Sequence, residues 1–237
     1  MDRPFYGDFI VKVIPALIDF LPVTLLIMAG TVFFSLLLGF VLVRARLGSQ
    51  AFPKKCAEAY CLAMRCTPSI VLLFIVYYGI PELAMAVFGV DINGIYRGVF
   101  VITALTLLYG AAMGEIMRSA YESVDKGQRE AALSAGLTER AAFLRIILPQ
   151  AAVAALPNFG SSLISLMKEG ALAYTIGIVD MMGQGMIIIA RNYGSYGLET
   201  YIALALIYWA LTLVIERAFL TLEKRLSRGK RSLGQTA

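Results

Sequence analysis

The sequence predicts an all-α integral membrane protein with about five transmembrane helices, and three observations support this class. Hydrophobic residues form 59% of the chain and charged residues 16%, whereas a soluble domain carries about 25% charged residues. The mean hydropathy is +0.76. The apolar residues gather into blocks of about 20, the length that a helix needs to cross the hydrocarbon core. Because no linker separates these blocks, residues 1–237 are expected to form a single membrane domain.

Five apolar blocks are expected to cross the membrane. The second is interrupted by Arg65 and by Thr67-Pro68, and the fourth has a poorly defined end because apolar residues continue over 171–178. The run Ile187–Ile189 is too short to span and predicts a partly buried helix. The expected spans are Leu21–Val43, Ala57–Ile80, Gly98–Ala120, Ala151–Met167 and Gly197–Leu220.

The distribution of lysine and arginine indicates how these spans are oriented, because cytoplasmic segments carry an excess of both residues. One side of the expected membrane holds Arg44, Arg46, Lys54, Lys55, Lys126, Arg129, Arg140, Arg145, Lys224, Arg225, Arg228, Lys230 and Arg231. The other side holds only Arg3, Lys12, Arg97 and Arg191. Five spans with the N-terminus outside and the C-terminus in the cytoplasm place the basic segments inside, whereas a sixth would export the tail. The net charge of +5 thus reflects membrane anchoring and does not indicate nucleic-acid binding.

Several classes of chemistry are disfavoured by residues that the sequence lacks. Histidine is absent, which removes His-based catalytic triads and most zinc sites. The cysteines Cys56, Cys61 and Cys66 follow one another in steps that rotate a helical side chain by about 140°, so a shared metal site or a disulfide is not expected. There is no G-x-x-x-x-G-K-[ST] motif for ATP and no G-x-S-x-G elbow for an intramembrane hydrolase. No cofactor is expected in this chain.

The polar segment of about 122–148, between the third and fourth spans, is expected to hold a short exposed helix. Gly127 can release the end of the preceding helix, and Gly136 can end the short one. Between them Glu130, Ala131 and Ala132 are expected to form a narrow ridge that a partner protein can approach closely. An ordinary Ala-rich surface helix is the alternative interpretation.

This segment carries a resemblance to a known family. Glu-Ala-Ala, three residues, glycine, then about nine residues to I-x-L-P resembles the cytoplasmic loop of ABC importer permeases. The stretch from Arg65-Cys66-Thr67-Pro68 to Tyr77-Tyr78-Gly79-Ile80-Pro81 looks like R-G-T-P … Y-x-G-x-P of polar amino acid permeases of the histidine/glutamine/arginine type, and Lys168 continues the match. The chain departs from the pattern at Cys66, where glycine is usual, and at Gly170-Ala171, where Thr-Ser is usual.

The resemblance implies the type I ABC importer permease fold and a role as the permease subunit that carries a polar amino acid or a related compound. It implies several partners: two ABC ATPase subunits that bind ATP and Mg, a second permease subunit, identical or not, and an extracytoplasmic solute-binding protein. The location would be the bacterial cytoplasmic (inner) membrane, in contact with lipid. The coupling loop of about 122–148 would receive the motion of the ATPase.

Candidate substrate-path residues are ionisable or backbone-breaking groups at membrane depth, because charges there usually face the protein interior or a cavity. Thr67-Pro68 should bend the helix and free carbonyls beside Arg65, whose guanidinium could bind a carboxylate. A structural ion pair of Arg65 with Glu58 or Glu169 is the alternative. The expected path residues are Arg65, Thr67, Pro68, Ser69, Lys168, Glu169, Gly170 and Ala171.

Three further features each allow two interpretations. Lys168–Gly170 forms either a charged gate or an interfacial anchor in which Gly170 stops the helix. Glu115 and Arg118 lie three residues apart on one helix face and are expected to form a local pair. The external segment Arg191–Gly197 is either a landing surface for the solute-binding protein or a connecting loop. The missing Thr-Ser groups also leave open a membrane scaffold subunit that docks the ATPase without binding substrate.

Overall fold

The computed structural model describes residues 5–227, and within them the chain is helical with no strand. Arg3, Arg228, Lys230 and Arg231 of the expected charge pattern lie outside the described residues. The first half of the chain forms α1 (Gly7–Ile18), α2 (Leu21–Leu47), α3 (Ala51–Cys66), α4 (Ser69–Phe74), η1 (Ile75–Gly79), α5 (Ile80–Phe88) and α6 (Arg97–Glu122). The second half forms α7 (Lys126–Ser134), α8 (Glu139–Ala142), η2 (Phe143–Ile147), α9 (Leu148–Gly170), η3 (Ala171–Ile176), α10 (Met181–Arg191) and α11 (Gly197–Ser227).

Five helical stretches are long and apolar enough to cross a membrane, which confirms the expected all-α class and the expected number of spans. They are Leu21–Leu47, Ser69–Phe88, Arg97–Glu122, Glu139–Ile176 and Gly197–Ser227. The run Ile187–Ile189 lies in the partly buried α10, as expected.

The second span differs from the expected block at 57–80, which the structure divides in two. Helix α3 ends at Cys66, and Thr67 (φ −97°, ψ 123°) and Pro68 (φ −61°, ψ 137°) are extended. Proline has no N–H to donate and pushes the residue before it out of the helical region. The expected break is therefore confirmed, and the apolar stretch of spanning length begins only at Ser69.

The fourth span is longer than expected and does not stop at Gly170. The helical path runs from Glu139 through α8, η2, α9 and η3 to Ile176. Gly170 keeps a right-handed helical conformation (φ −55°) and the chain tightens there into a 3₁₀ turn. The path ends at Gly177, where φ is +82°, a conformation that glycine adopts without a steric penalty. The α-helix thus ends at Gly170, as the anchor interpretation expected, but the span continues beyond it as a 3₁₀ turn.

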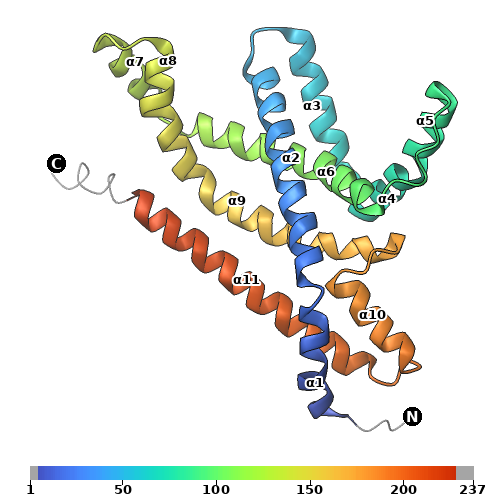
Figure 1. Cartoon of the computed structure of the whole chain (residues 1–237). Coiled ribbons are helices and arrows are strands. Elements are labelled where there is room, and N and C mark those ends of the chain that lie inside the picture. The colour runs from blue at the N-terminus through green and yellow to red at the C-terminus, as the bar shows by residue number, and fades with distance from the viewer. Residues whose placement is uncertain (1–4, 228–237) are drawn as a thin grey trace.

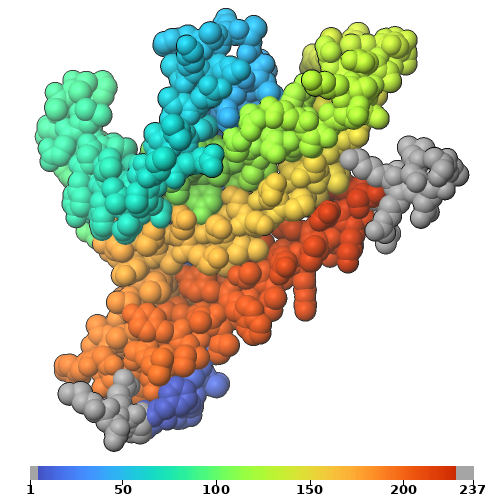
Figure 2. All heavy atoms as spheres, turned by 180° about the vertical axis from the view of Figure 1, so that it is seen from behind, coloured from blue at the N-terminus to red at the C-terminus, as the bar shows by residue number. Residues whose placement is uncertain are grey.

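Helices α2 and α6 form the centre of the molecule. In Figure 1, α2 passes across α6 and α9, α3 lies beside the upper half of α2, and α5 projects away. The buried core includes Phe100, Val101 and Leu105 of α6 together with Leu73 of α4. Figure 2 shows α9 between α6 and α11 in diagonal layers. Membrane helices pack in this way mainly through van der Waals contact, since lipid gives them little hydrophobic drive to associate.

A second core joins the two ends of the chain. Val13 and Leu17 of α1 are buried against Met181 of α10 and Leu204 of α11, and Figure 1 shows α1 against the first turns of α11. Asp180, fully buried before α10, accepts a hydrogen bond of 2.8 Å from the Gly183 N–H. This carboxylate caps α10, in agreement with the preference of helix starts for aspartate.

Candidate functional site

The polar segment between α6 and α9 folds into two short helices that follow α6 almost directly. Helix α6 ends at Glu122, and Asp125 caps α7 by accepting a hydrogen bond of 2.6 Å from the Gly127 N–H. Gly127 therefore lies in the first turn of α7, and its expected role of releasing the preceding helix is wrong. A Cβ at this position would lie 2.9 Å from Asp125 Oδ1. Glycine is thus suited to Gly127 because it lets the cap approach.

The end of α7 agrees with the expectation for Gly136. Its φ is +85°, in the left-handed region, and its N–H donates to the Leu133 carbonyl at 2.9 Å. The next N–H, of Leu137, donates to the Ala132 carbonyl at 3.1 Å. These two hydrogen bonds form the Schellman pattern, which satisfies the last carbonyls of a helix. The chain then turns sharply into α8.

The ridge expected on α7 is only partly exposed. Glu130, Ala131, Ala135 and Gly136 are exposed, but Ala132 is buried, with 3% of its surface accessible. Ala132 therefore packs inside the segment and does not face a partner, which corrects its expected role. A small side chain is needed there because α7 lies close to η2, and the free face of α7 is carried by the other residues.

Contacts within the segment hold α7 firmly. Arg129 forms a bidentate ion pair with Glu139 of α8, and Thr138 caps α8 by accepting from the Ala141 N–H at 3.3 Å. Bidentate arginine–carboxylate pairs fix orientation as well as distance. Since α8, η2 and α9 follow one another without a break, a displacement of α7 would pass directly into α9.

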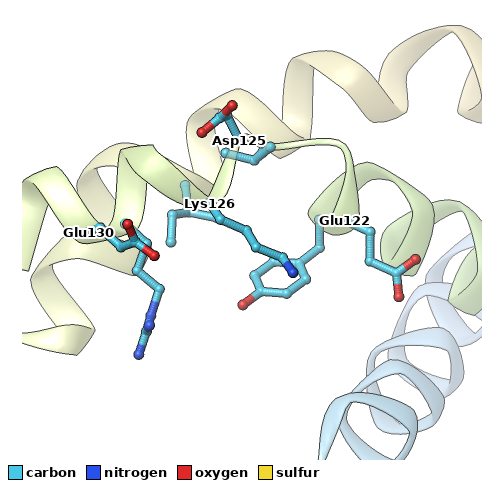
Figure 3. Close-up of a pocket in the computed structure, with 8 residues that line it drawn as sticks. Glu122, Asp125, Lys126 and Glu130 are labelled. Carbon is cyan, nitrogen blue, oxygen red and sulfur yellow. The ribbon is translucent and has the colours of Figure 1, made fainter.

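A cavity of about 670 Å³ opens between the end of α6, α7 and η2. In Figure 3, Lys126 points into the space between Glu122 and Glu130, and the carboxylate of Asp125 points away. The cavity is therefore lined by charges of both signs. Its lining residues are Tyr121, Glu122, Val124, Asp125, Lys126, Arg129, Glu130 and Ile147.

Arg65 lies at the end of α3 and is exposed. Among the described residues no ion pair joins it to Glu58 or to Glu169, so the structural-pair alternative is not present in this structure. Thr67 donates its hydroxyl to the Ala63 carbonyl at 2.8 Å, which closes the end of the helix just after the arginine. The guanidinium is left accessible beside the break.

Ser69 and Glu169, from two expected path segments, lie near one another in the structure. Glu169 is half-buried and interacts with Ser69 and with Tyr109 of α6. Its Oε2 is buried and has no hydrogen-bond partner among residues 5–227. Lys168 is exposed and Gly170 is buried. Tyr109 was not among the expected residues, because an aromatic residue inside an apolar span carries no sequence signal for a site.

The segment between α10 and α11 presents one highly exposed aromatic side chain. Tyr193 is 97% exposed, and its φ of +51° is unusual for a residue other than glycine. Its neighbour Tyr196 instead stacks on Phe9 of α1, with ring centroids 4.0 Å apart and an angle of 12° between the planes. The segment is thus anchored by α1 and offers Tyr193 to its surroundings.

Comparisons with known proteins place the chain in a family. Residues 32–228 match the model of the family described as binding-protein-dependent transport system inner membrane component. The chain is 39% identical to an L-cystine transport system permease protein of Bacillus subtilis, over 97% of this chain and 95% of that protein. It is 32% identical to the arginine transport system permease protein of the same organism, over 90% and 93%.

Solved structures of ABC transporters are also similar to this chain. A crystal structure of an amino acid ABC transporter with histidines contains a chain that is 31% identical, with a TM-score of 0.80 over 94% of this chain and 99% of that one. An inward-facing methionine ABC transporter has a TM-score of 0.68 at 19% identity, which shows a similar fold.

Proposed function

The chain belongs to the family of binding-protein-dependent transport system inner membrane components. From this premise we propose how it is coupled to ATP hydrolysis and which class of substrate it transports. It is a multi-pass permease subunit of an ABC importer in the inner membrane and has the type I importer permease fold. Such a subunit works with an ATPase and a solute-binding protein. The scaffold alternative is not favoured, because the relatives matched over nearly their whole length are transport permeases.

Energy enters, in this proposal, through the free face of α7. The observation that carries it is an exposed Glu130-Ala131 surface on a helix braced by Arg129–Glu139 and joined directly to α6 and α8. Rigid elements of this kind pass a rigid-body motion of a partner into the structure behind them. ATP and Mg would be bound by the partner ATPase, since the chain has no phosphate-binding motif of its own.

The cargo that we propose is a polar amino acid or a close derivative. Glu169 offers a buried, unpaired acceptor oxygen beside Ser69 and Tyr109, which suits an ammonium group. Arg65 offers an accessible guanidinium, which suits a carboxylate. The names of the cystine and arginine relatives support the same class of cargo. The eight predicted path residues at 65–69 and 168–171 keep this role in the proposal.

The assembly follows from the same proposal. Residues 1–237 act as one membrane domain with the N-terminus outside and the C-terminus in the cytoplasm. A second permease subunit, identical or related, completes the path, and each permease receives one ATPase subunit. The solute-binding protein docks on the external side, near Tyr193.

The coupling part is tested by purifying the tagged chain in mild detergent from its native cells and identifying the proteins that copurify. An ATPase subunit is expected with the wild-type chain and with A131S, which adds a single atom. It should be lost with A131L, because a bulky side chain on the free face of α7 would block docking. An A131L chain that retains the ATPase at wild-type levels would refute docking on this face.

A further inference from the structure

Four charged side chains form a continuous chain between α2 and α6. Arg46 of α2 donates to one carboxylate oxygen of Glu115, and Arg118 donates to the other. Arg118 also donates to Glu122, the last residue of α6. Both oxygens of Glu115 are thus occupied by arginines from two different helices. Only the Glu115–Arg118 pair was expected from the sequence.

Glu115 is paired with two arginines whose side chains are mostly buried. The side chain of Arg46 is 15% exposed and that of Arg118 25%. The Nε atoms of both arginines are buried and have no hydrogen-bond partner among the described residues. The side chain of Glu115 is itself 36% exposed, so solvent screens the pair in part. Without the charge of Glu115, the two guanidinium groups would face one another unpaired, at a cost smaller than that of breaking a fully buried pair.

The ion chain lies beside a close backbone contact between the same two helices. A Cβ at Gly39 of α2 would meet the backbone N of Gly114 at 2.9 Å, and Gly114 directly precedes Glu115. Helices that approach this closely at small residues cannot slide past one another without separating. Close packing and paired charges therefore hold the C-terminal half of α2 to α6.

The ion chain ends at the last residue of α6, where the coupling loop begins. Glu122 lines the cavity beneath α7, and only residues 123–125 separate it from α7. At its other end α2 is tied to the α10 region, because the hydroxyl of Thr24 accepts from the Met181 N–H at 3.3 Å. A displacement of α7 would thus reach α6 through the short connection 123–125, and it would reach α2 through the ion pair between Glu115 and Arg46.

We propose that Glu115 is a positioning residue that makes α2 move with α6 when the coupling loop is displaced. The inference rests on the proposed function, because it assumes that the loop receives the motion of an ATPase. In this account Arg46 and Glu115 do not touch the cargo or the ATPase. They determine how far the movement of the ATPase is transmitted to the membrane helices.

The test measures uptake and ATP hydrolysis in the same vesicles, with the chain reconstituted with its copurified partners. In E115Q the ATPase should remain bound and active, while the amount of amino acid carried per ATP hydrolysed should fall at least about fivefold, the lower range of coupling effects between sites. In R46Q the amount carried per ATP should fall similarly. In the R46Q/E115Q double variant it should fall no further than in E115Q, because both substitutions remove the same interaction between α2 and α6. D8N, which removes the exposed Asp8–Lys12 pair of α1, is the matched control and should keep the wild-type ratio.

The outcomes separate this inference from the proposed function. If E115Q assembles with its ATPase and keeps the wild-type ratio of transport to hydrolysis, the inference is overturned. If E115Q does not assemble, R46Q decides in its place, because it leaves the Glu115–Arg118 pair intact. A strictly additive double variant would also contradict a shared role. Wild-type vesicles without any ATP-dependent uptake would instead refute the proposed function.

Discussion

Gly39 of α2 and Gly114 of α6 lie so close that a Cβ on Gly39 would come within 2.9 Å of the Gly114 backbone N. Real Cβ atoms do not approach a backbone atom this closely, so any larger residue must push the two helices apart. The contact lies between the two most extensively packed helices of the fold. The whole membrane domain therefore depends on it.

The first prediction concerns this contact. G39V should destabilise the purified protein by about 1–3 kcal/mol, the usual cost of forcing extra atoms into a packed interior, and should lower its melting temperature in detergent. G79A is the matched control, because a Cβ at Gly79 meets nothing within 4 Å. Equal melting temperatures for G39V and the wild type would contradict the close packing of α2 and α6.

The second prediction separates the two alanines of the coupling loop. A132L should disorder the loop, because Ala132 is 3% exposed, and should increase its cleavage by a protease added to the detergent-solubilised protein. A131L should leave the cleavage rate unchanged and lose only the ATPase, since Ala131 is exposed. The opposite pattern, with A131L cleaved faster than A132L, would show that α7 is turned the other way.

The third prediction concerns pH. Burial raises the pKa of Asp180, which lies outside the five spans, from 3.8 to about 6. The folded state then binds this proton more tightly than the unfolded chain does. The resulting contribution to stability is complete below about pH 3.8 and is lost as the pH rises through about 6. At pH 8 a charged carboxylate is buried at a net cost.

D180N should therefore raise the melting temperature at pH 8 more than at pH 5, because asparagine keeps an acceptor for the Gly183 N–H without the buried charge. At pH 5, D180A should reduce the stability by about 0.5–2 kcal/mol, the usual cost of a lost cap. At pH 8 the loss should be smaller, because D180A also removes the buried charge. A D180N effect that is independent of pH between 5 and 8 would contradict a carboxyl group that titrates near 6.

The fourth prediction concerns the cargo. E169Q should reduce the efficiency of uptake by roughly 10- to 100-fold, since a hydrogen bond to a charged group contributes about 1.5–3 kcal/mol. E58Q is the control, because Glu58 is exposed on α3 and contacts no predicted path residue through an ion pair in the described chain. Wild-type uptake kinetics in E169Q would remove Glu169 from the path.

Local rules predicted the features whose cause is local. Thr67-Pro68 breaks the helix because proline does so in any context, and Gly136 ends α7 because the left-handed region favours glycine. The five apolar blocks are recognisable because lipid requires them. The family resemblance was carried by these same local patterns.

Packing between distant elements decided what the sequence could not predict. Gly170 and Gly177 are equivalent as residues, and only the surrounding helices determine that Gly177 takes the positive φ. Ala131 and Ala132 are identical residues, and only the fold determines that Ala132 is buried and Ala131 exposed. Arg46 and Glu115 are 69 residues apart, and nothing in the sequence pairs them.

In our proposal this chain passes a polar amino acid through the membrane at the expense of ATP hydrolysed by its partners. The most direct measurement is the uptake of labelled arginine, glutamine and cystine into vesicles that contain the copurified complex, with the solute-binding protein outside and Mg-ATP inside. Uptake of at least one of them should require ATP and should be lost in A131L. Hydrolysis of ATP with no uptake of any amino acid, by a complex that retains its binding protein, would contradict it.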